Sequence, residues 1–341
     1  MTDADHDAAP VDRRTAAKFA VGVAVAVLLV YLLGVAVGWA ETRRRLRVAD
    51  GRWVAAACLS SLLCLAAWAK TWQVVVRALG VAVPYRKLVT TFLAATFANY
   101  VTPMGQAGGE PFIAYVLARD TEASYEESLA SVVAADLLRA LPFLNVGVVG
   151  AGYVLLTRSA GGRTVEFAAA LGVLAVGLPV GVAAVWRFRT VVGRAVVAVV
   201  RPVARRTDRI DLGAVRDRLE RLSASVERIA ADRRALVVAV GFAYAGWALF
   251  ALPLYLSGLA LGLPVALPLV AFLVPATVVA GAAPTPGGLA AIEGSLVVLL
   301  GALTALSAGE ALAVTTVYRL TSYWLVVGVG GLAALWVVRR A

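Results

Sequence analysis

Long apolar runs are the feature of this chain that most limits how it can fold. A helix needs about 20 apolar residues to cross the hydrocarbon core of a bilayer. Runs of that length lie at roughly 18–40, 53–79, 128–156, 165–187, 235–259 and 310–337. Apolar residues make up 61% of the 341 positions and charged residues 16%, whereas soluble domains are about half apolar and about a quarter charged. We therefore expect an all-α polytopic membrane protein, and exclude a soluble enzyme, a disordered chain and a disulfide scaffold.

Two further apolar regions, 88–119 and 264–304, are each interrupted by a segment rich in proline and glycine. The interruptions read TPMGQAGGEP at 102–111 and APTPGG at 283–288. The arms around the first interruption have about 14 and 9 residues, too few to span singly. Irregular backbone at membrane depth is tolerated only where protein or a water-filled cavity shields it. We predict that both regions are re-entrant helical hairpins, which dip into the membrane and return to the same side.

The one long polar segment, 187–235, carries thirteen arginines and six acidic residues. Apolar residues recur at four-three spacing from Val215 to Ile229, which predicts an amphipathic helix rather than a loose linker. Its basic face is expected in the cytoplasm, beside anionic lipid head groups as partners. The segment is almost free of the aromatic residues that stack on bases, which argues against nucleic acid. Pairing with a second copy, as a homodimer, is the alternative.

Placing this segment in the cytoplasm fixes the side of every other loop. With both hairpins re-entrant, both termini are cytoplasmic and 22 basic residues lie inside against 7 outside. If 88–119 crosses once instead, with the N-terminus outside, the counts are 21 and 8, so charge alone separates the two topologies weakly. We divide this protein of the cell membrane into a polar tail 1–17, a first membrane repeat 18–186, the basic segment 187–234 and a second membrane repeat 235–341.

The two interrupted regions share an order of residues that favours the hairpin topology. In each, a proline is followed seven residues later by a glutamate, and then by a long apolar helix with one arginine. These residues are Pro103, Glu110 and Arg139 in the first region and Pro286, Glu293 and Arg319 in the second. Each region follows a spanning helix. In the hairpin topology, the first region enters the membrane from the cytoplasmic side and the second from the outside. We therefore expect an inverted repeat, an architecture found in many transporters.

Residues of these kinds suit the binding of a charged head group. A break exposes half-helix N-termini, whose free N–H groups attract anions, and glycines let a ligand approach the backbone. A charge at the bilayer centre costs at least about 2.5–3.5 kcal/mol, so it is retained where it pairs or binds. The candidate substrate-binding residues are Pro103, Gly105, Gly108, Gly109, Glu110, Asp136, Arg139, Pro286, Gly287, Gly288, Glu293 and Arg319.

The alternative for these charged residues is structural. Glu110 with Arg139, and Glu293 with Arg319, could be ion pairs that only lock the hairpins, with Asp136 neutralising Arg139 one helical turn away. Lys70 is expected to extend its amine to the membrane surface. Four aromatic residues are expected to serve packing or the interfacial belt: Tyr318, Tyr323, Trp324 and Trp336.

Cofactor chemistry is not expected. The only histidine is His6, in the polar tail, and the only cysteines, Cys58 and Cys64, lie inside one apolar run. This leaves no ligand set for zinc or haem and no base for histidine-dependent nucleophilic catalysis. No phosphate-binding P-loop is present, so an ATP-driven pump is not expected either.

Two pairs of segments resemble the signatures of a known family. They read TPMGQAGGEPFIAYVLARD with SLASVVAADLLRALPF, and PTPGGLAAIEGSLVVLLGAL with VYRLTSYWLVVGVGGLAAL. They are similar, in order and spacing, to the lysylphosphatidylglycerol synthase transmembrane-region family, also called flippase-like, and the likeness covers the chain from residue 18. The resemblance implies an integral membrane protein that translocates lipids such as aminoacylated phosphatidylglycerol. The family's signature positions fall on the residues already named and on Pro111.

Three features set this chain apart from that pattern. Some members of the family carry a soluble aminoacyl-transferase domain, which we do not expect here, so synthase activity is not carried over. The apolar run 112–114 replaces a basic residue that commonly follows the Glu-Pro pair, and Ala290 stands where glycine is common. The missing basic residue at 112–114 argues against a substrate phosphate bound in the same way as in relatives that have that residue.

Together these observations predict a lipid flippase rather than an enzyme. An anionic or lipid-linked head group would pass through a cavity between the two hairpins. Arginines would pair with phosphate, because the guanidinium fork binds two oxygens, and glutamates with a cation or a proton. The alternatives are an intramembrane transferase acting on a phospholipid or polyprenyl-phosphate substrate, an ion-coupled transporter of a small solute, and a purely structural subunit.

Overall fold

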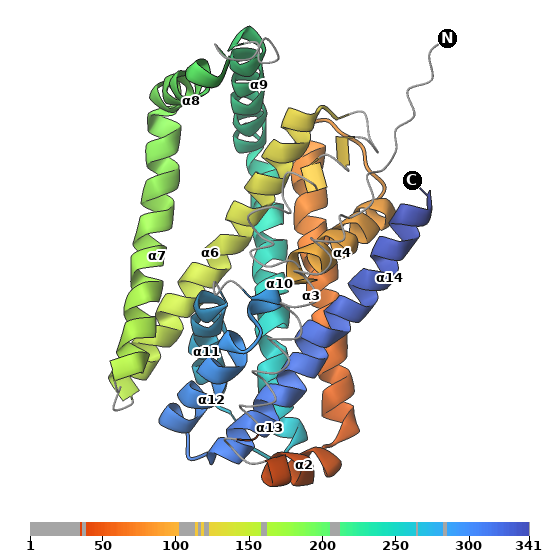
Figure 1. Cartoon of the computed structure of the whole chain (residues 1–341), viewed down its shortest axis with the longest axis vertical. Helices are drawn as coiled ribbons and strands as arrows, with labels where there is room; N and C mark the ends of the chain where they lie inside the picture. Colours follow the sequence, from red (N-terminus) through yellow and green to blue (C-terminus); the bar gives the residue numbers. More distant parts are fainter. Residues whose placement is uncertain are drawn as a thin grey trace.

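The computed structural model describes residues 35, 39–101, 113–114, 117–118, 123–157, 162–204, 212–263, 265–281 and 285–340. Every element within these ranges is helical (Figure 1). The elements are α2 (Trp39–Arg47), α3 (Gly51–Ala78), α4 (Tyr85–Val101), α6 (Tyr125–Thr157), α7 (Gly162–Arg187), α8 (Arg189–Ala204), α9 (Leu212–Ala231), α10 (Arg233–Ala260), α11 (Leu267–Ala280), the 3-10 turn η1 (Pro286–Gly288), α12 (Ala291–Leu303), α13 (Ala308–Arg319), the π-helical turn η2 (Leu320–Trp324) and α14 (Leu325–Arg340).

Six candidate membrane spans lie in the described part of the chain. They are Gly51–Ala78, Tyr125–Thr157, Thr164–Arg187, Arg233–Ala260, Pro286–Leu303 and Ala308–Val337. Five coincide with predicted runs, and the all-helical polytopic fold is confirmed. The predicted run 18–40 lies outside the described residues, apart from positions 35, 39 and 40. The sixth span falls in a region predicted to be a hairpin, and it contains the break at η1.

The helices α3 and α10 form the centre of the bundle and pack along their length. The backbone N–H of Asp50, just before α3, donates to the carbonyl of Ala260 at the end of α10, 2.8 Å away, so the two helices are antiparallel. Gly246 of α10 makes close packing possible, because a Cβ there would lie 2.3 Å from the Trp68 ring. Small residues at such contacts are typical of membrane helices, which gain stability from packing rather than from the hydrophobic effect.

The other helices pack reciprocally around this centre. We call α3, α4 and α6 the first unit, and α10 to α14 the second. The helix α4 packs on α14, and α11 packs on α6, so each unit's first short helix lies on the long helix of the other unit. Gly330 of α14 admits the carbonyl of Leu93, and Gly150 of α6 admits the backbone of Ala271. These glycines follow Arg319 and Arg139 by eleven residues each.

The chain between α10 and α13 leaves and returns at one end of the bundle. The Ala260 carbonyl, at the end of α10, accepts a hydrogen bond from Asp50, which lies just after α2. The helix α2 also contacts the start of α13. Thr42 donates to the Gly309 carbonyl at 3.4 Å, and Arg45 pairs with Glu310. Between these points, α11 and α12 contact each other and have only 14 and 13 residues. At about 1.5 Å per residue, α11 alone is shorter than a bilayer core, and α12 reaches the length of a candidate span only together with η1.

The chain between α3 and α6 begins and ends at the opposite end, beneath α9. There Glu126 and Glu127, in the first turn of α6, pair with Arg221 and Arg228 of α9 at 3.2 and 2.8 Å. The helix α9 packs mainly on α6, with further contacts to α10 and α3, and its apolar residues Leu222, Val226 and Ile229 join the apolar cluster at this end. Of the predicted second arm of this hairpin, only 113–114 and 117–118 are described, and both are helical.

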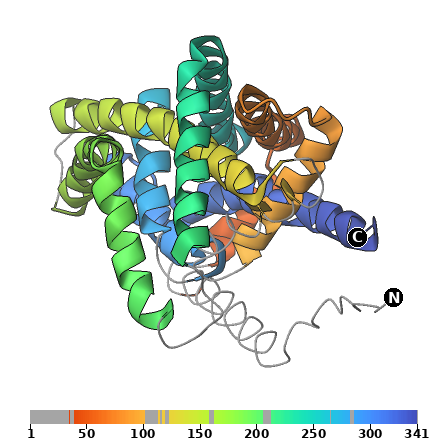
Figure 2. The same cartoon turned by 90° about the horizontal axis from the view of Figure 1, so that it is seen from above.

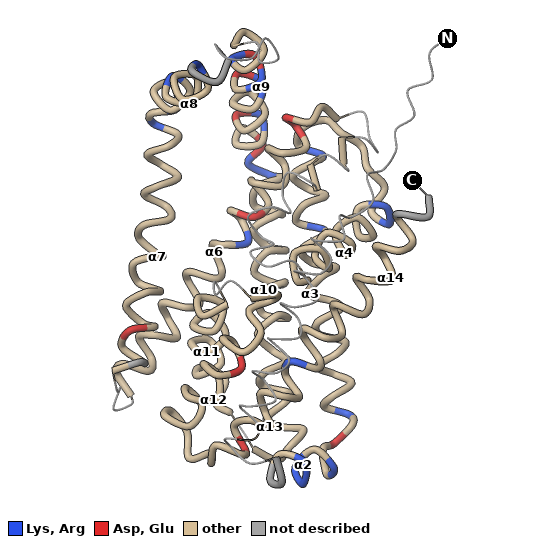
Figure 3. The backbone as a smooth tube through the Cα atoms, in the orientation of Figure 1, with Lys and Arg blue, Asp and Glu red and all other residues tan. Residues whose placement is uncertain are grey.

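The basic segment 187–235 is divided, where one amphipathic helix was predicted. It forms α8 and α9, with 205–211 outside the described residues, and α10 begins within it. Its basic residues gather at the α9 end of the molecule, and those of α2 at the other end (Figure 3). Seen from above, α7 and α8 stand on one side of the bundle and the end of α14 projects from the other (Figure 2).

Candidate functional site

The break in the second unit is a tight turn that requires glycine. Gly287 and Gly288 have φ values of 56° and 65°, in the left-handed region that glycine adopts without strain. A Cβ on Gly287 would lie 2.1 Å from the Tyr323 ring, and one on Gly288 would lie 2.8 Å from the Cα atom of Gly281. The turn is therefore packed on both sides, and α12 begins three residues after Gly288, at Ala291.

Glu293 and Arg319 meet at this break. Glu293 lies in the first turn of α12, and Arg319 is the last residue of α13. The Arg319 Nε donates to Glu293 Oε1 at 2.6 Å, and its Nη2 donates to the Gly287 carbonyl at 3.2 Å. The two side chains are only 9% (Arg319) and 5% (Glu293) exposed. Three residues predicted from the sequence are thus joined in one buried cluster.

The second oxygen of this carboxylate is unsatisfied. Glu293 Oε2 is buried and has no hydrogen-bond partner among the described residues. The N-cap residue of α12 is Ala290, which offers no side-chain hydrogen bond to the helix. A buried polar atom without a partner is unfavourable, and such atoms in native proteins often mark a functional site. Glu293 Oε2 can therefore bind a proton, or accept a hydrogen bond from a cationic group.

Tyr323 connects the cluster to the first unit. It lies in the π-helical turn η2, and its ring centroid is 4.2 Å from the Arg319 guanidinium carbon. The ring stacks on Tyr100, at the end of α4, with centroids 5.3 Å apart, and its hydroxyl donates to the Tyr100 carbonyl at 3.3 Å. Single π turns often occur at functional sites. The sequence indicated a packing or interfacial role for Tyr323, and its place four residues after Arg319 was the available signal.

The other three aromatic residues agree with a packing or interfacial role. Tyr318 is buried, whereas Trp324 and Trp336 are exposed on the outer surface of the bundle. Lys70, predicted to reach the membrane surface, donates to Gln73 at 2.7 Å and lies over the Tyr85 ring.

The first unit presents Arg139 in a similar setting. Arg139 pairs with Asp136 one turn earlier on α6. Its guanidinium carbon lies 5.3 Å from the centroid of Phe92 and 5.7 Å from that of Trp68. Pro142 follows Arg139 by three residues, and the π turn begins directly after Arg319. A proline and a π turn are both features that can bend a helix. Each arginine therefore lies beside an acidic and an aromatic partner; Arg319 precedes a π-helical turn and Arg139 precedes a proline within a continuous helix.

The remaining candidates of the first unit lie outside the described residues. They are Pro103, Gly105, Gly108, Gly109 and Glu110. The predicted pairing of Glu110 with Arg139 therefore stays a prediction. Pro286 of the second unit is buried at the start of η1, where it begins the turn described above.

Known proteins match this chain over most of its length. The sequence model of the family described as "Lysylphosphatidylglycerol synthase TM region" matches residues 19–330. Two relatives, both named UPF0104 membrane protein, come from Methanothermobacter thermautotrophicus. One is 26% identical over 318 residues, covering 92% of this chain and 94% of the relative. The other is 24% identical over 335 residues, covering 95% and 94%. No solved structure matches the chain.

Proposed function

The chain belongs to the lysylphosphatidylglycerol synthase transmembrane-region family, and from that premise we propose that this multi-pass membrane protein is a lipid flippase. It moves an anionic or lipid-linked head group across the cell membrane, through the region between its two broken units. The two broken regions are re-entrant hairpins related as inverted repeats, and both termini are cytoplasmic. Its partners are anionic membrane lipids, with a second copy of the chain as a further one, and it binds no nucleic acid.

The observation that carries the proposal is the buried Glu293–Arg319 pair at a helix break. A guanidinium can exchange a carboxylate for a phosphate, because both present two oxygens to its fork. A phosphate that replaces Glu293 on Arg319 adds one negative charge to a buried site, which is unfavourable unless a positive charge accompanies it. The free Glu293 Oε2 is placed to take that proton or cation. The head group therefore passes as a neutral assembly.

The depth of the two arginines supports a route through the middle of the bundle. Arg139 lies 14 residues into α6 and Arg319 lies 11 residues into α13, helices that begin at opposite ends. At about 1.5 Å per residue, these positions are roughly 21 and 17 Å from their starting ends. The hydrocarbon core is about 30 Å thick, so both arginines belong near its centre.

A lipid-flipping assay tests this proposal. Purified protein is placed in liposomes with fluorescent phosphatidylglycerol or phosphatidylcholine, and dithionite bleaches the outer leaflet. Bleaching beyond one half is expected for the wild type, and a return to one half for Arg139→Ala and Arg319→Ala. Arg45→Ala is the matched control, because that arginine also pairs with a glutamate but lies at the end of the bundle. Folded Arg139 and Arg319 variants that flip lipid normally would refute the proposed roles.

We also propose that no chemical step occurs on the lipid. Incubation of labelled phospholipid with the protein in detergent is expected to leave the lipid unchanged on chromatography. A new lipid product would favour a transferase instead. Uptake of a small solute by proteoliposomes, dependent on an ion gradient and without lipid flipping, would favour a solute transporter.

A further inference from the structure

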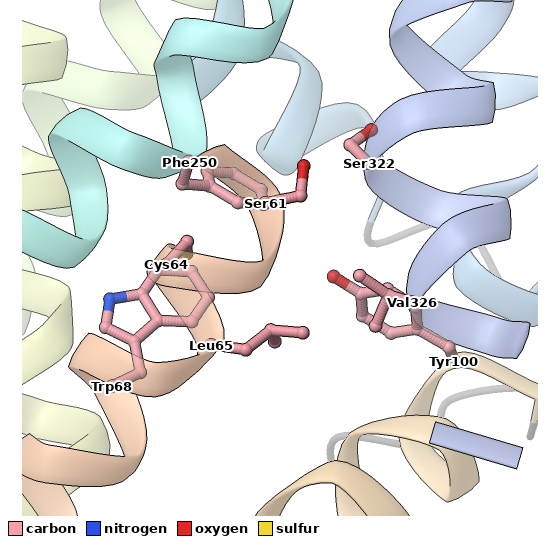
Figure 4. Close-up of a pocket in the computed structure, with 8 residues that line it drawn as sticks. All are labelled: Ser61, Cys64, Leu65, Trp68, Tyr100, Phe250, Ser322 and Val326. Atoms are coloured by element: carbon pink, nitrogen blue, oxygen red, sulfur yellow. The ribbon is translucent and has the colours of Figure 1, made fainter. Parts of the chain in front are cut away.

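A groove lies between the end of α3 and the start of α10, at the α9 end of the molecule (Figure 1). Its volume is about 270 Å³, just below the roughly 300–1,000 Å³ of sites for drug-sized ligands. A second cavity, at the centre of the bundle, is lined by residues such as Ser61 of α3 and Ser322 of η2 (Figure 4). That cavity has about 10 Å³, room for about one water molecule. Of these two, only the groove can take a lipid head group.

The groove is charged at its outer end and apolar towards the membrane. We call it the α3–α10 groove, and its lining residues include Val74, Arg77, Asp232, Arg234, Ala235 and Val238. Val74 comes three residues before Arg77, and Val238 four residues after Arg234. Each valine therefore lies about one helical turn, roughly 5 Å, further into the bundle than its arginine. A phospholipid has the same order of polarity, with a charged phosphate at the surface and acyl chains below it.

Both arginines of the groove have their charge available for a ligand. Arg77 and Arg234 are exposed, and neither forms an ion pair with a described acidic residue. On the neighbouring α9, by contrast, Arg221 and Arg228 already pair with glutamates of α6 at 3.2 and 2.8 Å. Two guanidinium groups on opposite walls of one groove are donors well suited to phosphate oxygens.

The acidic residue of the groove caps a helix. Asp232 is the N-cap of α10, and its Oδ1 accepts a hydrogen bond from the Ala235 backbone N–H at 2.9 Å. A carboxylate in this position is stabilised by the free N–H groups and the positive end of the helix dipole. It therefore does not neutralise both arginines, and the groove keeps a net positive charge.

The groove opens onto a surface that faces lipid. Val237 and Val238 are 72% and 41% exposed, on a helix that is a candidate membrane span. Arg234 is the second residue of that helix, so it belongs at the edge of the hydrocarbon core. The proposed topology places this end of the bundle in the cytoplasm. Basic pockets between membrane helices on that side are typical sites for anionic lipid head groups.

We propose that the α3–α10 groove binds one anionic phospholipid of the cytoplasmic leaflet, with its phosphate between Arg77 and Arg234 and an acyl chain along Val74 and Val238. The inference rests on the proposed flippase function in one respect, that the bound lipid is the substrate before it is moved. The phosphate displaces only water from the arginines, because no described carboxylate pairs with them. A zwitterionic lipid binds more weakly, because its own ammonium group compensates its phosphate.

Arg77→Gln and Arg234→Gln test the contact with the head group. Purified protein in detergent is heated with increasing short-chain phosphatidylglycerol, and the melting temperature is followed. Each variant is expected to need about fivefold more lipid than the wild type for the same rise, and the double variant about 25-fold more. Without lipid, the variants are expected to melt with the wild type, because neither arginine loses an ion pair.

Arg233→Gln is the matched control. Arg233 is the neighbour of Arg234 and is also exposed, but it does not line the groove. It is expected to bind phosphatidylglycerol like the wild type. Equal weakening in the Arg77, Arg233 and Arg234 variants would show that the lipid is attracted by a diffuse basic surface, and would overturn the inference.

Ala235→Leu tests the apolar part of the site. The larger side chain occupies the groove and leaves both arginines in place, so phosphatidylglycerol is expected to bind more weakly. Val237→Leu, on the exposed surface beside the groove, is the control and is expected to have no effect. An equal rise in melting temperature with inorganic phosphate would identify a free anion as the occupant, and an equal rise with short-chain phosphatidylcholine would show no selection of charge. Either result would overturn the inference.

The dithionite assay separates this inference from the proposed function. If the wild type binds phosphatidylglycerol in the groove but flips no lipid, the proposed function fails and the inference stands. If the wild type flips lipid and the Arg77 and Arg234 variants bind phosphatidylglycerol as tightly as the wild type, the inference fails and the proposed function stands.

Discussion

Replacing both members of the Glu293–Arg319 pair distinguishes a structural ion pair from a binding site. The side chains are 5% and 9% exposed and are joined at 2.6 Å, so Arg319→Met alone leaves a buried carboxylate without its partner. Breaking a buried pair in this way costs about 3–5 kcal/mol of unfolding free energy. Glu293→Leu combined with Arg319→Met leaves no uncompensated charge, and such replacements are often neutral or stabilising.

The double variant still loses two contacts of the arginine. The hydrogen bond to the Gly287 carbonyl is worth about 1 kcal/mol, and the contact with the Tyr323 ring about 1–2 kcal/mol. We therefore expect the double variant to regain part of the stability that Arg319→Met loses, and to lie within about 3 kcal/mol of the wild type. We expect it to flip no lipid, because the phosphate partner is gone.

Thermal unfolding in detergent and the dithionite assay measure these two quantities on the same protein. The control is Glu310→Leu with Arg45→Met, which removes a more exposed pair at the end of the bundle and is expected to leave flipping intact. A Glu293–Arg319 double variant that is both stable and active would refute the reasoning, since the pair would then only lock the break. A double variant as unstable as Arg319→Met would show that charge compensation is not what stabilises the pair.

Three smaller changes test the local geometry, each by thermal unfolding. Gly287→Ala combines a positive φ with a Cβ 2.1 Å from Tyr323, so we expect a loss of about 2 kcal/mol or more; unchanged stability would contradict the packed turn. Ala290 has a φ of 69°, which strains an alanine by about 2 kcal/mol. Replacement by glycine removes this strain but costs roughly 1 kcal/mol, because the unfolded chain gains entropy and a methyl group is no longer buried. Ala290→Gly is therefore expected to raise stability by about 1 kcal/mol, and a decrease would rule out strain there. Glu127→Gln removes a pair whose Arg228 side chain is half exposed, so we expect a loss below about 1 kcal/mol that fades at high salt; a larger loss, insensitive to salt, would mean that the pair is effectively buried.

The membrane spans were predictable because a bilayer imposes one simple requirement on a sequence. Apolar length alone located five of the six candidate spans, and the break at 283–288 was visible as proline and glycine. The spacing from Pro286 through Glu293 to Arg319 also predicted the cluster that the structure brings together. These features depend on local composition, which a single sequence contains.

The features that sequence reasoning missed depend on contacts between distant segments. Nothing local to Ser61 distinguishes it from Ser60, yet the Ser60 hydroxyl donates to the Leu249 carbonyl of α10, whereas the Ser61 hydroxyl is buried without a partner among the described residues. The stacking of Tyr100 on Tyr323 joins residues far apart in the chain, and the π turn that places Tyr323 has no composition signal of its own. The division of 187–235 into α8 and α9 was likewise hidden by a continuous basic composition.

The reciprocal packing through Gly150 and Gly330 has a consequence for how the polypeptide is assembled. The short helix α4 finds its long partner, α14, only at the far end of the chain, and α11 packs on α6 from the other half. Because each short helix has its main partner in the other half, we expect an N-terminal fragment made first in the membrane to stay incomplete until the second half has been inserted. We expect the two halves, produced as separate polypeptides, to be degraded singly and to be rescued when they are co-expressed.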